Sequence, residues 1–341
     1  MSTDTDIKVA IRDLYKIFGP KAALMTEHVR AGMSKDDLLE RYGHVVGLRA
    51  IDLDVTAHHI QVVMGLSGSG KSTLIRHINR LIEPTAGEVL VDGVDVLGMT
   101  QQELREFRRL KASMVFQRFA LLPHRTVVDN VAYGLRVQGM DKAEAAERGQ
   151  HWIDRVGLTG YEDYYTTQLS GGMQQRVGLA RALATDAEIL LMDEPFSALD
   201  PLIRTDMQNI LLDLQTELHK TIVFITHDLE EALRLGNNIA ILRDGEAVQI
   251  GTPQEIVMRP ADDYVAEFIK DINRGRAIEV ASIMDAEPAN GAPQVDAGAV
   301  LDDALQSLIG TGAEVATVTR NGKPVGSVRL ERIVSALAKP D

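Results

Sequence analysis

The feature that most constrains this chain is a glycine-rich loop between an apolar run and a helical pattern. "GLSGSGKST" at Gly65–Thr73 follows the run "IQVVM" (60–64) and leads into "TLIRHINRLI". It matches G-x-x-x-x-G-K-[ST], in which glycines let the backbone turn its N–H groups inward toward a phosphate. A simple Gly/Ser connector is the alternative, and the strand before the loop and the helix after it disfavour that interpretation.

Further apolar runs predict the sheet to which this loop belongs. They alternate with helical patterns up to about Gly251 and read "ASMVF" (112–116), "EILLM" (188–192), "TIVFI" (221–225) and "NIAIL" (238–242). Near-continuous apolar strands separated by helices predict a parallel sheet covered on both faces. A mostly helical stretch at about 119–168 predicts an inserted helical lobe.

Outside this region the chain changes character. A strand-like run at 7–19 precedes a helix, a break and a second helix, for which Ser34 is the expected cap. Residues 277–295 are rich in Ala, Pro, Gly and acids and predict a linker. A small α/β unit at 296–341 should follow, with a helix at 300–312, strands at 314–320 and 324–330 joined across Asn321-Gly322, and a last helix at 331–338.

Composition removes several classes of function. The 341 residues include no cysteine, which excludes disulfides, thiolate catalysis and cysteine-based zinc sites. A formal charge of -13 argues against a general nucleic-acid binder. The chain has neither an apolar run of the roughly 18 residues that a membrane span needs nor an N-terminal secretory signal. We therefore expect any link to a membrane to come through a partner.

Polar side chains follow the apolar runs directly. Gln117 follows the second run, Asp193 and Glu194 follow the third, and His227 comes two residues after the fourth. Because ligands of open α/β sheets bind outside the carboxyl ends of the strands, we expect these side chains at one edge, beside the glycine-rich loop. Each alone is more simply explained as structural, and their common location carries the prediction.

The chemistry expected at this edge is that of a nucleoside triphosphate. Lys71 would reach the β- and γ-phosphates, and the Ser72 hydroxyl would ligate Mg²⁺. Asp193 would hold the Mg²⁺ shell and Glu194 would orient the attacking water. Gln117 is a further predicted metal residue, and together with His227 it would sense the metal-bound water and the γ-phosphate. The phosphate-binding positions of the loop are predicted to be Gly65, Ser67, Gly68, Gly70, Lys71, Ser72 and Thr73.

Together these segments resemble an ATP-binding cassette (ABC) ATPase. The motifs are "GLSGSGKST", Gln117, "LSGGMQQR" (169–176), "ILLMDEP", "SALD" (197–200) and "ITHD" (225–228), in that family's order and spacing. The resemblance implies a P-loop cassette at 46–276, with a parallel-sheet core, an antiparallel β part and the helical lobe. Residues 1–45 would be an N-terminal strand and helical extension.

The resemblance also implies a head-to-tail pair of chains, with ATP and Mg²⁺ between them. Ser170, Gly171, Gly172 and Gln174 would complete the site of a second copy, because a helix N-terminus favours an anion. Asp200 would couple the two sites. The apolar stretch after Gln117 would grip a membrane permease, although a core-facing turn is the alternative there.

The N-terminal segment "LYKIFG…GMSKDDLLERYG" and the stretches "VFQRFALLPHRTVVDNVAYGL" and "LMDEPFSALDPLIRTDMQ" are similar to the ATPase of glycine betaine/proline betaine importers. This resemblance implies import of compatible solutes, attachment to the cytoplasmic side of the membrane through the permease, and an indirect link to a solute-binding protein. The unit at 296–341 looks like a single CBS-type repeat. Its bases all follow Thr319, which suits either an ionic-strength sensor or a solvated face.

Two points stay open at this stage. In this family an aromatic ring stacks on adenine, and Phe18 is preferred here over Tyr42. The usual Pro before "LSGG" is replaced by Thr167-Gln168, which bears on the stiffness of that loop. The alternative functions are an importer ATPase for another small polar solute such as an amino acid, a non-transport cassette protein, and a nucleotide-binding regulatory module.

Overall fold

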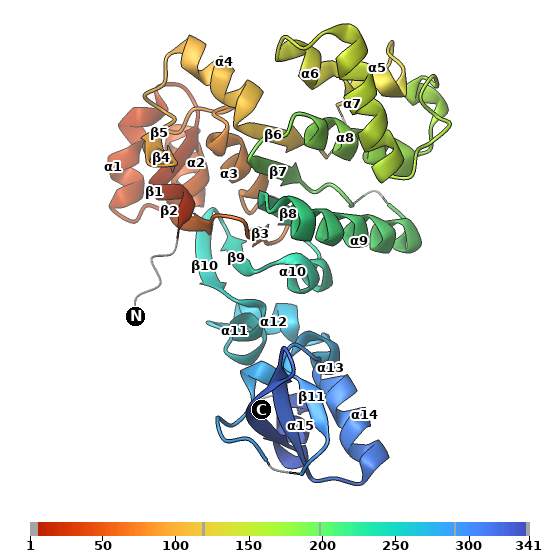
Figure 1. The fold of residues 1–341 in the computed structure, drawn as a ribbon. Helices are drawn as coiled ribbons and strands as arrows, with labels where there is room; N and C mark the ends of the chain where they lie inside the picture. The colour runs from red at the N-terminus through yellow and green to blue at the C-terminus, as the bar shows by residue number, and fades with distance from the viewer. Residues whose placement is uncertain (1–5, 118–119, 198, 290, 339–341) are drawn as a thin grey trace. The chain divides into compact units, whose positions relative to one another are not determined.

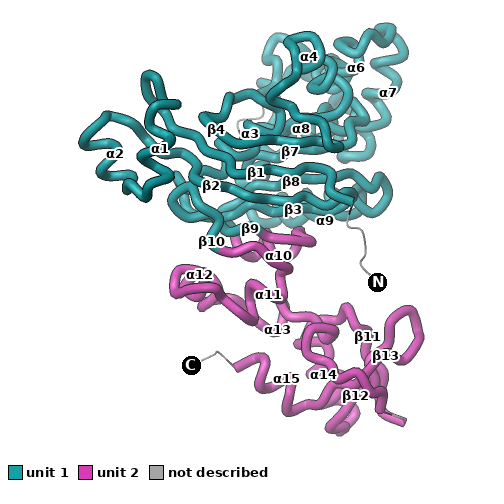
Figure 2. The backbone as a smooth tube through the Cα atoms, turned by 90° about the vertical axis from the view of Figure 1, so that its left-hand side faces the viewer, with its two compact units in different colours: residues 1–228, 240–248 teal, residues 229–239, 249–341 magenta. Residues whose placement is uncertain are grey.

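The computed structural model describes residues 6–117, 120–197, 199–289 and 291–338 (Figure 1). The chain forms two compact units, of which the first contains residues 1–228 and 240–248 and the second residues 229–239 and 249–341 (Figure 2). Within the described ranges, no helix is both long enough and apolar enough to cross a membrane.

The central sheet has six strands in the order β10-β9-β3-β8-β7-β6. Parallel pairing joins β3 to β8, β8 to β7 and β7 to β6. Every residue of β3, β7 and β8 is buried, as expected for strands covered on both faces. The strands are β3 (Ile60–Met64), β6 (Ala112–Val115), β7 (Ile189–Asp193), β8 (Thr221–Thr226), β9 (Asn238–Arg243) and β10 (Glu246–Gly251).

One edge of this sheet differs from the predicted parallel arrangement. The neighbouring strands β9 and β10 are joined by a two-residue turn at Asp244-Gly245. Adjacent strands joined so tightly run antiparallel, because a parallel pair needs a long crossover. The sheet is therefore mixed, with its parallel part at β3, β8, β7 and β6.

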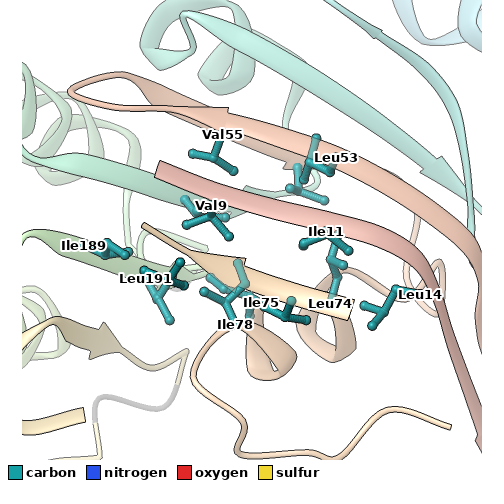
Figure 3. Packing of buried hydrophobic residues seen from close by; sticks show 14 of the residues in the cluster. Val9, Ile11, Leu14, Leu53, Val55, Leu74, Ile75, Ile78, Ile189 and Leu191 are labelled. Atoms are coloured by element: carbon teal, nitrogen blue, oxygen red, sulfur yellow. The ribbon is translucent and has the colours of Figure 1, made fainter. Parts of the chain in front are cut away.

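A second sheet is antiparallel and belongs to the same unit. Its order is β2-β1-β4-β5. The core lies between this sheet and the first, with the apolar face of helix α3 (Lys71–Ile78) packed into it. Figure 3 shows Leu74, Ile75 and Ile78 of α3 among side chains of β1, β2 and β7. The strands are β1 (Ile7–Phe18), β2 (Val45–Thr56), β4 (Ala86–Val91) and β5 (Val94–Asp95).

The N-terminal helices follow β1 as predicted. Ser34 caps α2, because its side chain accepts a hydrogen bond from the Asp37 N–H, so the expected cap is confirmed. The apolar side of these helices packs on Tyr15, Ile17 and Val46 of the antiparallel sheet. The helices are η1 (Ala22–Met25), α1 (Thr26–Arg30) and α2 (Lys35–Tyr42).

The chain segment that connects β6 to β7 forms a group of helices with its own apolar cluster, seen at the upper right of Figure 1. The cluster joins α5, α7 and α8 through residues such as Val131, Ile153 and Val177. Helix α4 (Gln101–Leu110) precedes β6, and α9 (Pro201–Leu218) follows β7. The helices between are α5 (Val127–Val131), α6 (Tyr133–Val137), α7 (Lys142–Arg155), η2 (Thr166–Gln168) and α8 (Gly171–Ala184). The predicted lobe boundary at 119 falls on a residue outside the described ranges.

The second unit contains the small α/β element predicted near the C-terminus. Strand β11 pairs parallel with β12, and β12 pairs antiparallel with β13 across the Asn321-Gly322 turn, so the predicted hairpin is confirmed. Both turn residues have positive φ, which Asn and Gly tolerate best. The elements are β11 (Gln294–Asp296), α14 (Leu301–Thr311), β12 (Val315–Arg320), β13 (Lys323–Arg329) and α15 (Leu330–Leu337).

Part of the segment predicted as a linker is packed. Ile278, Val280 and Ile283 are buried in the same cluster as α14 and the β12–β13 hairpin. Apolar side chains spaced along this segment reach that core, which its Ala/Pro/Gly-rich composition does not reveal. The preceding elements of the unit are α10 (Leu229–Leu235), α11 (Pro253–Met258), α12 (Asp263–Ile269), α13 (Arg274–Ala277) and η3 (Val280–Ser282).

Candidate active site at the carboxyl ends of the parallel strands

The glycine-rich loop connects β3 to α3, and two of its glycines cannot be replaced without movement. Gly65 and Gly70 have φ values of 146° and 102°, in the region that favours glycine. A Cβ on Gly65 would lie 2.1 Å from the Leu242 carbonyl oxygen, and one on Gly70 would lie 2.6 Å from the Gly47 carbonyl oxygen. The backbone of the loop is therefore wound against β2 and β9.

The ammonium group of Lys71 lies inside this loop. Its Nζ donates hydrogen bonds to the carbonyl oxygens of Gly65 at 2.8 Å and Leu66 at 3.0 Å. The residue is only 4% exposed, and burial lowers the pKa of Lys71 while the nearby charge of Glu194 opposes that change. A buried cation held among carbonyl oxygens is well suited to meet the oxygens of a phosphate.

The first carboxylate at the strand ends, Asp193, is 0% exposed. The Ser72 hydroxyl donates to its Oδ1 at 2.6 Å, and the Arg76 guanidinium donates to its Oδ2 at 3.1 Å. Ser72 and Asp193 are thus brought together as predicted for a metal site. Arg76 was not among the predicted site residues, although it lies one helical turn after Ser72, on the same side of α3.

The second carboxylate, Glu194, collects three polar partners. Gln117 Nε2 donates to its Oε2 at 3.2 Å, and His227 Nδ1 lies 3.2 Å from the same oxygen. Lys71 Nζ lies 3.7 Å from Oε1. Glu194 has a φ of 45°, which is uncommon for a residue other than glycine, and its N–H donates to the Ile225 carbonyl oxygen. The ends of β6, β7 and β8 therefore meet beside the loop.

The residues present fit a Mg²⁺ site completed by phosphate. Mg²⁺ prefers oxygen ligands and commonly uses one or two carboxylates together with phosphates and water. Ser72 and Asp193 offer such oxygens side by side. Among the described residues, no group of three His, Asp or Glu side chains could hold a metal by itself.

The "LSGG" turn begins helix α8 and is built differently. Ser170 caps the helix by accepting a hydrogen bond from the Met173 N–H at 3.4 Å. A Cβ on Gly171 would have open space around it, whereas one on Gly172 would lie 2.9 Å from Ile203 Cγ2. Gln174 Nε2 donates back to the Leu169 carbonyl oxygen at 3.1 Å. Among the described residues, no hydrogen bond joins this turn to the loop at Gly65–Thr73.

Local hydrogen bonds also fix two segments close to this turn in the sequence. The Gln168 Oε1 atom accepts a hydrogen bond from the Tyr165 N–H at 2.8 Å within η2, which gives the approach a fixed turn where the family usually has proline. Asp200 caps α9 by accepting from the Ile203 N–H at 3.1 Å. Ala198 of the "SALD" motif, and Arg118 and Phe119 after Gln117, lie outside the described residues.

The two aromatic candidates for adenine stacking have different surroundings. The Phe18 ring lies over Gly47, where a Cβ would be 2.6 Å from its Cε2, and the Gly47 carbonyl oxygen faces Gly70 of the loop. The Lys16 ammonium is 5.1 Å from its centroid. Tyr42 instead stacks on His28, with centroids 5.1 Å apart. Phe18 is therefore linked through Gly47 to the loop, whereas Tyr42 stacks on His28; each ring has one face occupied, by Lys16 and by His28 respectively.

Comparison with known proteins identifies this arrangement. The family model described as "ABC transporter" matches residues 48–197. The glycine betaine/proline betaine transport system ATP-binding protein ProV of Escherichia coli is 47% identical over 334 residues, which is 98% of this chain and 83% of that protein. The glycine betaine transport ATP-binding protein OpuAA of Bacillus subtilis is 52% identical over 285 residues, 83% of this chain and 68% of that protein.

A solved structure agrees with the fold. The structure titled "Dimeric Structure of MJ0796, a Bacterial ABC Transporter Cassette" has a TM-score of 0.62 and 31% identity, and it covers 72% of this chain and 98% of its own. The predicted cassette fold is confirmed by this match, while the CBS-like character of residues 296–341 stays a prediction. The chain thus belongs to the ABC transporter family, as an ATP-binding subunit related to those of glycine betaine/proline betaine importers.

Proposed function

We propose that this chain is the ATP-hydrolysing subunit of an importer for compatible solutes of the glycine betaine, proline betaine and choline class. The names of its relatives support this substrate class. The observation that carries the ATPase proposal is that Lys71, Asp193 and Glu194 converge at the carboxyl ends of the strands. Lys71 lies within ion-pair distance of Glu194, which also accepts a hydrogen bond from Gln117. Asp193 accepts a hydrogen bond from Ser72 of the glycine-rich loop. Within this class the solute itself is selected by the membrane and solute-binding partners.

In the proposed reaction the loop and Lys71 bind the β- and γ-phosphates of ATP. Ser72 and Asp193 would hold Mg²⁺, which when bound neutralises charge on the β- and γ-phosphate oxygens. Glu194 accepts a hydrogen bond from the attacking water and orients it toward the γ-phosphorus. Gln117 and His227 hold the Glu194 carboxylate in place. The products are ADP and inorganic phosphate. Release of Lys71 from Glu194 to the phosphates leaves the carboxylate free for water.

The proposed working form is a head-to-tail pair of chains. Gly171 at the start of α8 is open while Ser170 is already used as a cap. This exposure supports a role against a γ-phosphate bound to the loop of a second copy, where helix N–H groups stabilise negative charge. Phe18 is proposed to stack on adenine. Asp200 is proposed to couple the two sites, and Gln174 to support the turn.

The pair is proposed to act on the cytoplasmic side of a membrane permease. The segment after Gln117 would contact that permease, so that closing and opening of the pair drives transport. A solute-binding protein would be an indirect partner. The uptake experiment uses radiolabelled glycine betaine in cells that express this chain with its permease and binding protein. ATP-dependent uptake is expected, and uptake suppressed by an amino acid but not by choline contradicts the substrate class.

Glu194→Gln tests the chemistry and the pair together. The amide keeps the shape of Glu194 but is a poor base, so turnover should fall at least about 100-fold while ATP binding persists. Light scattering after gel filtration should show the variant at twice the chain mass with ATP and Mg²⁺. Glu230→Gln, which changes an exposed carboxylate on α10, is the matched control with normal turnover. Near-normal hydrolysis by Glu194→Gln rejects the catalytic role of Glu194. A variant that stays monomeric with ATP bound rejects the head-to-tail pair.

For the C-terminal unit we propose a single CBS-like regulatory role. Support comes from its order of strand, helix, two antiparallel strands and helix, and from the exposed bases Lys323 and Arg329 on β13. Attraction of such bases to anionic lipid is screened within about 8–10 Å at physiological salt. The double variant Lys323→Gln/Arg329→Gln, tested with the permease in anionic liposomes, should weaken the salt dependence of ATPase activity. An unchanged salt dependence rejects the proposal that this unit senses ionic strength.

A further inference from the structure

Asp193 is held at both of its oxygens, by two different donors of the same helix. Ser72 donates to Oδ1 at 2.6 Å and Arg76 donates to Oδ2 at 3.1 Å. The carboxylate is completely buried, and the Arg76 side chain is 41% exposed. The neighbouring cation Lys71 lies instead beside Glu194. Each carboxylate at the strand ends therefore has its own cation.

The position of Arg76 on α3 makes this pairing rigid. It lies four residues after Ser72, so both side chains extend from one side of the helix in successive turns. Its carbonyl oxygen accepts hydrogen bonds from the N–H groups of Leu81 and Ile82 at 2.8 and 3.2 Å, which anchors the backbone where α3 ends. A planar guanidinium on such an anchored residue fixes the direction of a carboxylate better than a flexible ammonium.

We propose that Arg76 is a positioning residue for the metal site, which sets the orientation of Asp193 and thereby its affinity for Mg²⁺. This inference rests on the proposed role of Asp193 at the metal. With Oδ2 occupied by Arg76, the carboxylate cannot rotate, and Oδ1 stays beside the Ser72 hydroxyl. Arg76 also supplies the counter-charge that a buried carboxylate needs. Arg76 touches neither phosphate nor water in this proposal and acts only through Asp193.

The test is the full chain with Arg76→Met, titrated with Mn²⁺ by electron paramagnetic resonance in the presence of ADP. Loss of a partner that orients a metal ligand typically weakens metal binding by about 10- to 100-fold, so at least about tenfold is expected here. Affinity for ADP in EDTA should stay within about twofold of wild type. A merely structural role would weaken metal-free ADP binding in parallel, and that parallel loss overturns the proposal.

Two further variants keep the test decisive. Arg76→Lys retains the charge but lacks the planar guanidinium, so its metal affinity should lie about threefold below wild type, above that of Arg76→Met. This variant carries the test if Arg76→Met is too unstable to purify, and wild-type affinity in it would contradict the orienting role. Arg80→Met removes a nearby cation that pairs with Glu83 and should leave metal affinity unchanged. Unchanged or tighter Mn²⁺ binding in Arg76→Met overturns the proposal. Failure of wild type to bind Mn²⁺ with ADP would instead reject the metal role of Asp193 itself.

Discussion

Two glycine-containing turns begin helices in this unit, and their surroundings are opposite. The loop before α3 is wound against its own chain, so that Gly65 and Gly70 have backbone carbonyls where a side chain would be. The turn before α8 has Gly171 in open space. Lys71 in the first is buried among carbonyl oxygens, while Ser170 in the second is exposed and caps its helix.

The difference separates a glycine that the fold itself requires from one that it does not. Gly65 is required by its own fold, because both its φ and the close approach of β9 exclude a side chain. Nothing in the fold requires glycine at position 171, where alanine would suit a helix better. Glycine there keeps backbone N–H groups accessible from outside the chain. We infer that one turn is completed within its own protomer and the other by a partner.

The largest expected effect is that of Gly65→Ala. The new Cβ would lie 2.1 Å from the Leu242 carbonyl oxygen, at a φ of 146°, so we expect the free energy of unfolding to fall by more than about 3 kcal/mol or folding to fail. Denaturant unfolding measures this loss. Gly68→Ala is the control, because its φ is also positive but its surroundings are open, and it should lose only about 1 kcal/mol. Equal losses in the two variants would remove close approach as the cause.

The next effect concerns His77, which ties α3 into the core. The residue is 0% exposed, its Nδ1 donates to the Thr73 carbonyl oxygen at 2.6 Å, and its Nε2 has no partner. Burial lowers the pKa of His77 from 6.5 to about 4. The unfolded chain therefore takes up a proton before the folded one does. The stabilisation of the folded chain that depends on neutral His77 is fully present above pH 6.5. It falls as the pH drops toward 4, by up to about 3 kcal/mol.

His77→Gln removes this titration and tests it. Unfolding of wild type and variant is followed between pH 7.5 and pH 4 at constant salt, and the difference between their free energies of unfolding should change across that window. Other titrating groups contribute equally to both chains and cancel in the difference. A difference that stays constant with pH would show that His77 is not held neutral.

Gly171→Ala should separate function from stability. The free energy of unfolding is expected to stay constant or rise by up to about 1 kcal/mol, because alanine favours a helix. ATP turnover should fall at least about tenfold, since a Cβ would narrow the space through which a partner's γ-phosphate reaches the N–H groups. Gly172→Ala should instead disturb packing against Ile203 and so lower stability as well. Normal turnover in Gly171→Ala contradicts the functional assignment.

Mixing two impaired variants extends this test. Lys71→Ala lacks a working loop but keeps its "LSGG" turn, and Gly171→Ala has the reverse defect. A mixture should form pairs with one complete site and recover ATP-dependent dimers that neither variant forms alone. No recovery in the mixture would indicate that both turns serve a site within one protomer.

The smallest effect is expected for adenine stacking. Phe18→Ala should weaken ATP affinity about fivefold, near the lower end of the roughly 1–3 kcal/mol that base–aromatic stacking is worth, because this ring is only partly exposed. Tyr42→Ala should change affinity less than about twofold, since Tyr42 already stacks on His28. Equilibrium titration with a fluorescent ATP analogue compares the two. The reverse order of effects would place adenine on Tyr42.

Much of this protein follows from sequence because local signals dominate there. The loop at Gly65–Thr73 needs glycine for its φ values, the Asn321-Gly322 turn needs positive φ, and Ser34 caps a helix only three residues away. Buried parallel strands appear as apolar runs, and their carboxyl ends show which polar side chains converge. Each of these features depends on a few consecutive residues or on a general rule of sheet topology.

Other features were decided by tertiary structure alone. Arg76 pairs with Asp193, 117 residues away, and its spacing from Ser72 does not reveal that partner. Ile278 and Val280 are packed although their segment has a linker's composition. Gly65 and Gly171 look alike in sequence, yet only the first has a backbone carbonyl against it. Neighbouring residues determine local hydrogen bonding and backbone geometry, whereas burial and ion pairing depend on which distant segment the fold brings near.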